Sequence, residues 1–162
     1  MFPRGTTLFI LDRFRSAYNV GSVFRTAESV RPAAVFPCGI SALPGGRKVG
    51  RTSRGTHGLV PWRWFPDAME AADWAVKAGF GLFVVENTPG AIPLQSAPFT
   101  PETALVFGNE AEGVSPEIFA MAREIVTIPQ TGERRCVNVA SAAAAVAWEI
   151  LRRRLTGCSP GP

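Results

Sequence analysis

The chain has 162 residues, which suits one domain with a substantial core, and 46% of them are hydrophobic. Lysine and arginine number 17 against 13 acidic residues, and this net charge of +4 permits an RNA or phosphate partner without requiring one. No stretch approaches the roughly 20 uninterrupted apolar residues of a membrane span, and the start lacks an apolar targeting core, so we expect a cytoplasmic protein.

Three cysteines and one histidine argue against a metal centre. Cys38, Cys136 and Cys158 show no C-x-x-C spacing, and His57 is the only histidine. We therefore expect no metal, and the odd number of cysteines favours a reducing compartment.

Apolar runs and helical spacings alternate along the chain. The expected strands lie at 7–11, 33–36, 80–85, 103–107 and 125–128. The expected helices begin at Asn19, at Pro66–Asp67, at Ser115–Pro116 and after Asn138. This alternation predicts an α/β fold, a parallel sheet flanked by helices. We expect a single domain over residues 1–155 and a disordered tail over 156–162.

A long stretch, 38–58, combines many glycines with basic side chains and is expected to lack regular structure. A phosphate-binding arm is favoured over a solvated surface connection, because loops this long in compact domains are usually functional. The basic residues concerned are Arg47, Lys48, Arg51 and Arg54. Residues 61–65 that follow are expected to be extended, with two tryptophans that either stack on bases or, as we favour, pack in the core.

The segment 133–148 runs from a polar loop into a helix that is apolar on nearly every side. Such a helix is expected to be buried on nearly every side, either threaded through the molecule or pressed against a partner. The loop before it would then be held rigidly enough for chemistry. Arg152, Arg153 and Arg154 at the end of this helix are interpreted as a solvated terminus that favours the helix dipole.

Ligands in open α/β sheets gather outside the carboxyl ends of the strands. Three loops qualify, namely those after Val85, Phe107 and Ile128, and they converge if their strands are neighbours. The first strand is followed by 12–15 without a glycine, so an ordinary dinucleotide-type turn is absent there. Any cofactor pocket is expected to come from the C-terminal half.

Three segments together resemble the motifs of the SpoU/TrmH-type methyltransferases of the SPOUT superfamily. They are 19–27 (NVGSVFRTA), 107–115 (FGNEAEGVS), and 128–132 (IPQTG) with 136–140 (CVNVA). The resemblance implies an α/β fold with a C-terminal deep trefoil knot, a homodimer, and S-adenosylmethionine bound in the knot. It also implies methyl transfer to a ribose 2′-hydroxyl of tRNA or rRNA.

By position in these motifs, the resemblance assigns four catalytic residues: Asn19, Arg25, Glu110 and Asn138. It places the cofactor on a second set of residues, mainly through backbone groups: Glu86, Asn87, Gly108, Ile128, Cys136, Val137 and Ala140. The family usually has serine where this chain has Cys136, and a thiol is the weaker hydrogen-bonding group.

Each assignment has a structural alternative. Arg25 taken alone is a solvated surface arginine, Asn19 is a helix cap, and Glu112 rivals Glu110 as the acidic residue of its loop. Asn138 is also suited to cap the last helix. At the level of the whole chain, the alternatives are a knotted RNA-binding protein without catalytic activity, and methylation of a protein or small molecule.

Overall fold

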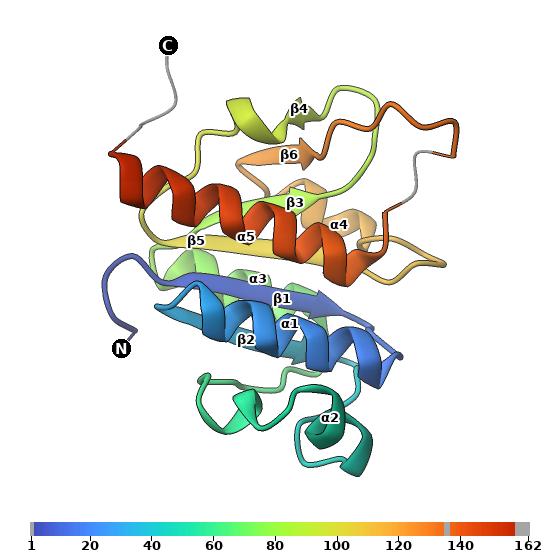
Figure 1. The fold of residues 1–162 in the computed structure, drawn as a ribbon. Coiled ribbons are helices and arrows are strands. Elements are labelled where there is room, and N and C mark those ends of the chain that lie inside the picture. The colour runs from blue at the N-terminus through green and yellow to red at the C-terminus, as the bar shows by residue number, and fades with distance from the viewer. Residues whose placement is uncertain (1, 135–136, 158–162) are drawn as a thin grey trace.

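The computed structural model describes residues 2–134 and 137–157. Its centre is a six-stranded sheet in the order β2-β1-β5-β3-β6-β4, in which every pairing is parallel (Figure 1). The strands are β1 (Thr7–Asp12), β2 (Ala33–Cys38), β3 (Gly81–Val85), β4 (Ile92–Pro93), β5 (Thr103–Gly108) and β6 (Glu124–Thr127). The predicted parallel sheet is confirmed, and the short strand β4 was not predicted because no apolar run marks it.

Helices cover both faces of the sheet. On one face lie α1 (Ala17–Ser29) and α5 (Val139–Thr156), and on the other lie α3 (Ala68–Lys77) and α4 (Pro116–Phe119) (Figure 1). Each face has its own core. Alternate side chains of β1 divide between them: Phe9 and Leu11 pack with α1 and α5, while Leu8 and Ile10 pack with α3 and α4. All four are fully buried, which explains the continuous apolar run of this strand.

The helix caps correct one expectation. The cap of α1 is Ser16, whose hydroxyl accepts a hydrogen bond from the Asn19 backbone nitrogen at 3.3 Å. Asn19 is therefore inside the first turn, and its interpretation as the cap is wrong. Asp67 caps α3, and Asn138 caps α5 as predicted. Asn19 keeps its side chain free for other partners because a residue three positions earlier satisfies the helix end.

The stretch 38–58 is more ordered than predicted. It contains α2 (Arg47–Thr52) and the 3-10 turn η1 (Thr56–Gly58). Helix α2 packs on α1 where Gly21 lies, and a Cβ added there would come within 2.1 Å of the Thr52 hydroxyl oxygen. That hydroxyl donates to the Ala17 carbonyl at 2.9 Å. The glycines thus permit close helix packing, whereas we had interpreted them only as breakers of regular structure.

Residues 61–65 extend along the free edge of β2, as predicted. The Val35 nitrogen donates to the Pro61 carbonyl, and the Phe65 nitrogen donates to the Pro37 carbonyl. Core packing of the two tryptophans, however, is wrong: Trp62 is 42% and Trp64 is 45% exposed, and only Phe65 of this segment is buried.

Within the single chain, α5 is buried on one side only. Its inward side chains include Ala143, Val146 and Ile150, whereas Ala145 and Trp148 are exposed. The expected solvated end is also wrong for Arg153, which is 8% exposed. Its guanidinium donates to the carbonyls of residues 94, 95 and 97. In the part of the chain that the structure describes, no helix is long and apolar enough to cross a membrane.

Candidate functional site

The three loops that follow β5, β3 and β6 converge, because these strands are neighbours in the sheet. Together with the start of α5 they enclose a cavity of about 250 Å³. Of the residues expected to hold a cofactor, five line it: Glu86, Asn87, Gly108, Ile128 and Val137. Ala140 lines an adjoining groove instead. Cys136 lies outside the described residues.

The inner wall of the cavity is apolar and its rim is polar. Val85, Phe107 and Val126 supply the wall from three adjacent strand ends, while Gln130 and Thr127 add polar groups. An apolar slot with a few fixed polar groups is the usual form of a small-molecule site. Gln130 and Thr127 were not among the predicted residues, because a single polar residue in a loop or at the end of a strand follows no period.

A tight turn over 109–113 forms one side of the cavity. A Cβ added to Gly108 would lie 2.0 Å from the Gly113 carbonyl carbon, so only glycine allows this approach. The Asn109 side-chain oxygen accepts hydrogen bonds at 2.9 Å from the Ala111 and Glu112 backbone nitrogens. This leaves the Asn109 amide nitrogen buried without a hydrogen-bond partner in the described parts of the chain. Asn109 is a residue that the sequence reasoning missed.

Three of the predicted catalytic residues form one hydrogen-bonded chain. The Asn138 amide nitrogen donates to the Asn19 side-chain oxygen at 3.2 Å, and the Asn19 amide nitrogen donates to a carboxylate oxygen of Glu110. Asn138 also caps α5, since its oxygen accepts from the backbone nitrogens of residues 140 and 141. The cap and the polar chain therefore coexist in one side chain. Glu110, rather than Glu112, is the acidic residue that faces Asn19.

Arg25 lies apart from this chain but shares a groove with it. A groove of about 740 Å³ between α1 and α5 is lined by Asn19, Arg25 and Asn138. The Arg25 side chain is exposed and makes no hydrogen bond or ion pair within residues 2–134 and 137–157. Its position, open yet beside the polar chain, suits contact with a ligand.

A second groove, of about 490 Å³, leads from Arg25 to α2. It is lined by Arg25, Lys48, Arg51 and Arg54, so three of the four predicted RNA-binding cations reach it. Arg47 is exposed at the start of α2 and lines neither groove. The two grooves share Arg25, and a path lined by cations therefore runs from the polar chain towards α2.

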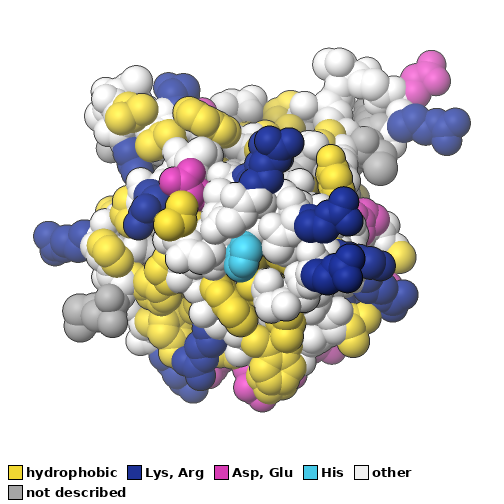
Figure 2. All heavy atoms as spheres, turned by 60° about the horizontal axis from the view of Figure 1, so that its bottom comes forward, with side chains coloured by type: hydrophobic (Ala, Val, Ile, Leu, Met, Phe, Trp, Pro, Cys, Tyr) yellow, Lys and Arg dark blue, Asp and Glu magenta, His cyan; other side chains and the backbone are white. Residues whose placement is uncertain are grey.

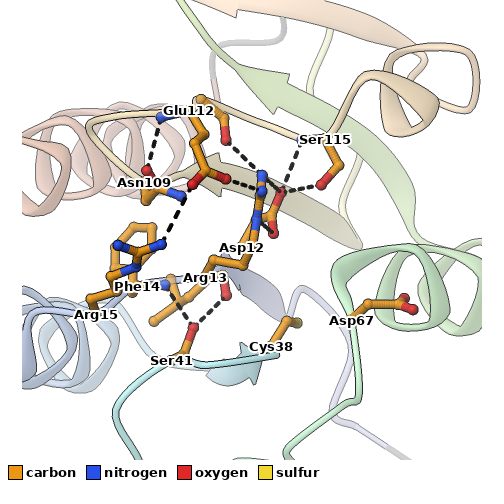
Figure 3. Close-up of polar contacts among 12 residues, drawn as sticks. Asp12, Arg13, Phe14, Arg15, Cys38, Ser41, Asp67, Asn109, Glu112 and Ser115 are labelled. Carbon is orange, nitrogen blue, oxygen red and sulfur yellow. Dashed lines mark hydrogen bonds and ion pairs between the residues drawn. The ribbon is translucent and has the colours of Figure 1, made fainter.

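A cluster around Asp12 holds the turn 109–113 in place (Figure 3). Asp12 is 2% exposed and accepts hydrogen bonds from the Ser115 nitrogen at 2.9 Å and hydroxyl at 2.8 Å. Arg13 donates to Asp12 at 2.9 Å, pairs with Glu112, and donates to the Gly113 carbonyl at 3.3 Å. The hydrogen bond to Asp12 raises the pKa of Arg13, despite partial burial.

Arg13 adopts the left-handed backbone region, at φ 56°, which places its side chain over the turn. Sequence reasoning did not select Asp12 or Arg13. The available signal was a carboxylate directly at the end of an otherwise apolar strand, where ligand sites or their supports usually lie.

The remaining nucleophile and metal candidates are weak. Burial raises the pKa of Cys38, reinforced by the charges of Asp12 and Asp67, so its thiol stays protonated (Figure 3). His57 is hydrogen-bonded through Nδ1 to the Ser53 hydroxyl at 2.6 Å. Over the described ranges, no three histidine, cysteine or acidic side chains gather in a way that would hold a metal ion.

Comparison with known proteins gives a consistent result. The model of the SpoU rRNA methylase family matches residues 6–148. A tRNA (guanosine(18)-2′-O)-methyltransferase of Thermus thermophilus is 32% identical over 149 residues, covering 90% of this chain and 74% of that protein. A 23S rRNA (uridine(2479)-2′-O)-methyltransferase of Streptomyces viridochromogenes is 30% identical over 152 residues, covering 91% and 53%.

Solved structures give the same result for the fold. The SpoU methyltransferase AviRb from Streptomyces viridochromogenes, in complex with the cofactor AdoMet, superposes with a TM-score of 0.87 at 28% identity. The match covers 96% of this chain and 63% of that chain. This chain therefore spans about three fifths of the length of that structure.

Proposed function

Because the chain belongs to the SpoU rRNA methylase family, we propose that it transfers a methyl group from S-adenosylmethionine to a ribose 2′-hydroxyl of tRNA or rRNA. The observation that supports this most directly is the placement of the Asn19–Glu110–Asn138 chain beside the cavity at the ends of β5, β3 and β6. A pocket for a small molecule and a polar groove for a second substrate are what a two-substrate transfer needs.

The cavity suits S-adenosylmethionine. Its apolar wall fits a flat ring, and Gly108, packed against the Gly113 backbone, forms part of its lining. In the described parts of the chain the Asn109 amide nitrogen is buried without a hydrogen-bond partner, and Asn109 lines the cavity, so we assign it as a donor to the cofactor. We assign the cofactor to Asn109 together with the five predicted residues that line the cavity: Glu86, Asn87, Gly108, Ile128 and Val137.

The residue roles follow from their chemistry. Bound S-adenosylmethionine supplies a methyl group that is already activated, whereas a ribose hydroxyl is a poor nucleophile. Arg25 is assigned to grip that hydroxyl and a neighbouring phosphate, and Asn19 to orient it. Glu110 and Asn138 fix the Asn19 amide through the hydrogen bonds described above. The proton goes to an RNA phosphate rather than to Arg25, since a guanidinium stays protonated.

RNA would enter along the cationic path. Lys48, Arg51 and Arg54 line the groove that begins at Arg25, and Arg47 stands beside it on α2. Phosphates along this path would release counterions on binding, so affinity would fall steeply with added salt.

We further propose a homodimer and a C-terminal trefoil knot, as the family resemblance implies. The exposed Ala145 and Trp148 on α5, with Tyr18 71% exposed on α1, support an interface on this side of the sheet. A cytoplasmic location and a single domain over 1–155 remain predictions.

The decisive experiment is transfer of labelled methyl groups from S-adenosylmethionine to unmodified total RNA, with the modified position mapped. Arg25→Ala is expected to abolish transfer while leaving cofactor affinity, measured by isothermal titration, unchanged. Normal transfer by Arg25→Ala would contradict the assignment. Absence of cofactor binding by the unaltered protein would instead favour an RNA-binding protein without catalysis.

A further inference from the structure

The free edge of β2 carries two tryptophans in fixed positions. Trp62 and Trp64 are two residues apart in the extended segment 61–65, and alternate residues of an extended chain point the same way. The segment is tied to β2 by backbone hydrogen bonds on both sides of the pair. The Trp64 indole nitrogen also donates to the Gly39 carbonyl at 3.1 Å. Both side chains are exposed on a backbone that is fixed to β2, and the Trp64 ring is also held by its hydrogen bond.

Exposed apolar side chains are frequent in the same stretch of the chain. Five exposed large hydrophobic residues fall between positions 40 and 64: Ile40, Leu43, Leu59, Trp62 and Trp64. Contiguous exposed apolar surface on a water-soluble domain usually marks a contact site. The two rings are the largest of these groups, and each has a π-face suited to stacking.

The same part of the chain is strongly basic. Residues 30–66 contain six lysine and arginine residues and no acid, although the whole chain has 17 against 13. The rest of the chain therefore holds 11 cations against 13 acids and is net negative. No ion pair neutralises Arg51, Arg54 or Arg63 within the described ranges. Figure 2 shows lysine, arginine and hydrophobic side chains close together around the histidine on this side.

One cation in this segment already contacts an aromatic ring. The Arg63 guanidinium lies 4.6 Å from the centroid of the Phe65 ring, so its charge is held at the sheet edge. Cations alternating with exposed aromatic rings are typical of surfaces that bind single-stranded nucleic acid. There the charges follow the phosphates and the rings stack on bases.

This surface continues from the proposed site. Lys48, Arg51 and Arg54 border the groove that starts at Arg25, and Trp62 follows α2 and η1 in the chain, four residues after η1 ends. A strand of RNA with its ribose at Arg25 would follow the cations on α2 and continue to the tryptophans.

We propose that the edge formed by residues 59–64 is a stacking platform for unpaired bases of the RNA substrate, with Trp62 and Trp64 as its two rings. The inference rests on the proposed function and specifies its substrate class. The RNA is recognised in a loop or single strand flanking the modified nucleotide, because the bases of a duplex are stacked on one another and present no free face.

The test compares RNA affinity by fluorescence anisotropy, using a labelled 12-nucleotide single-stranded RNA and a duplex of equal length. Trp62→Ala and Trp64→Ala are each expected to weaken single-strand binding about tenfold. Trp62→Phe and Trp64→Phe retain a ring and should remain within about threefold of the unaltered protein. Val76→Ala removes exposed apolar surface on α3 and serves as the matched control.

Cofactor titration separates the two proposals. If the alanine variants bind single-stranded RNA normally while the unaltered protein binds cofactor and methylates RNA, the platform is refuted and the proposed function stands. If the unaltered protein does not bind cofactor, and the alanine variants bind single-stranded RNA more weakly than it does, the proposed function fails and the platform stands. A change in oligomeric mass without a change in RNA affinity would show a protein contact at this edge and refute the platform.

Discussion

Removal of the Asp12 carboxylate should loosen the turn that carries Glu110. Asp12 accepts two hydrogen bonds from Ser115 and two from Arg13, and it is 2% exposed. In Asp12→Ala the Ser115 backbone nitrogen loses its acceptor, at about 1–3 kcal/mol, and the hydroxyl bond contributes about 1 kcal/mol more. The pair with Arg13 is partly exposed and adds at most about 1 kcal/mol after solvent screening.

The expected loss is therefore about 3 kcal/mol of unfolding free energy, measured by urea denaturation at one fixed protein concentration. Arg15→Ala is the matched control. The Arg15 side chain is 69% exposed and lies 3.5 Å from Glu112, so its removal should lower the unfolding free energy by less than about 0.5 kcal/mol. Equal midpoints for Asp12→Ala and Arg15→Ala would refute the reasoning. Methyl transfer by Asp12→Ala should fall more than the loss of folded protein explains.

Three further predictions concern the same fold. Gly108→Ala should weaken cofactor affinity at least tenfold, because the added Cβ would meet a backbone carbon at 2.0 Å, whereas Gly132→Ala meets nothing within 4 Å and should bind normally in the same titration. Asn138→Ala should lower the unfolding free energy by about 1 kcal/mol, because the helix loses its cap. Asn138→Asp should keep that stability but lose methyl transfer, because it lacks the amide donor to Asn19. Normal methyl transfer by both variants would contradict the role of the polar chain. Hydrogen bonds from Arg152 and Arg153 lower the pKa of Glu149 from 4.5 to about 2. The pairing therefore stabilises the fold fully above pH 4.5, and this stabilisation is lost as the pH falls towards 2. Glu149→Gln should make stability depend less on pH in that window, and identical acid-denaturation curves for the two proteins would refute the prediction.

Strands and long helices were predictable because burial imposes a period on many residues at once. The run 103–107 is apolar at every position, and β5 is indeed buried on both faces at the centre of the sheet. Where a segment ends was harder. The strand expected at 33–36 continues through Pro37 to Cys38, because the Phe65 nitrogen donates to the Pro37 carbonyl.

Some residues of the site could also be predicted from the sequence, and others could not. The grouping of Asn19, Glu110 and Asn138, which come from three distant parts of the chain, followed from motif resemblance and not from any local pattern. Asp12 and Asn109 support that group by accepting hydrogen bonds from particular backbone nitrogens. No periodicity marks such residues, and only the folded geometry identifies them. Helix α2 was missed because glycine propensity was weighed without the close contact at Gly21.

Helix α5 begins at the polar chain and carries Arg153 in its last turn, where the guanidinium donates to the carbonyls of Leu94, Gln95 and Ala97. Those residues belong to the same excursion after β3 that begins with Glu86 and Asn87 in the cavity wall. One rigid helix of about 27 Å thus acts as a spacer between the two ends of the site. A deletion or fusion that disturbs Arg153 would release the segment 94–97, so activity should be sensitive to alterations well away from the cavity. Arg153→Lys would not restore these contacts, because an ammonium group lacks the forked donors with which the guanidinium reaches several carbonyls.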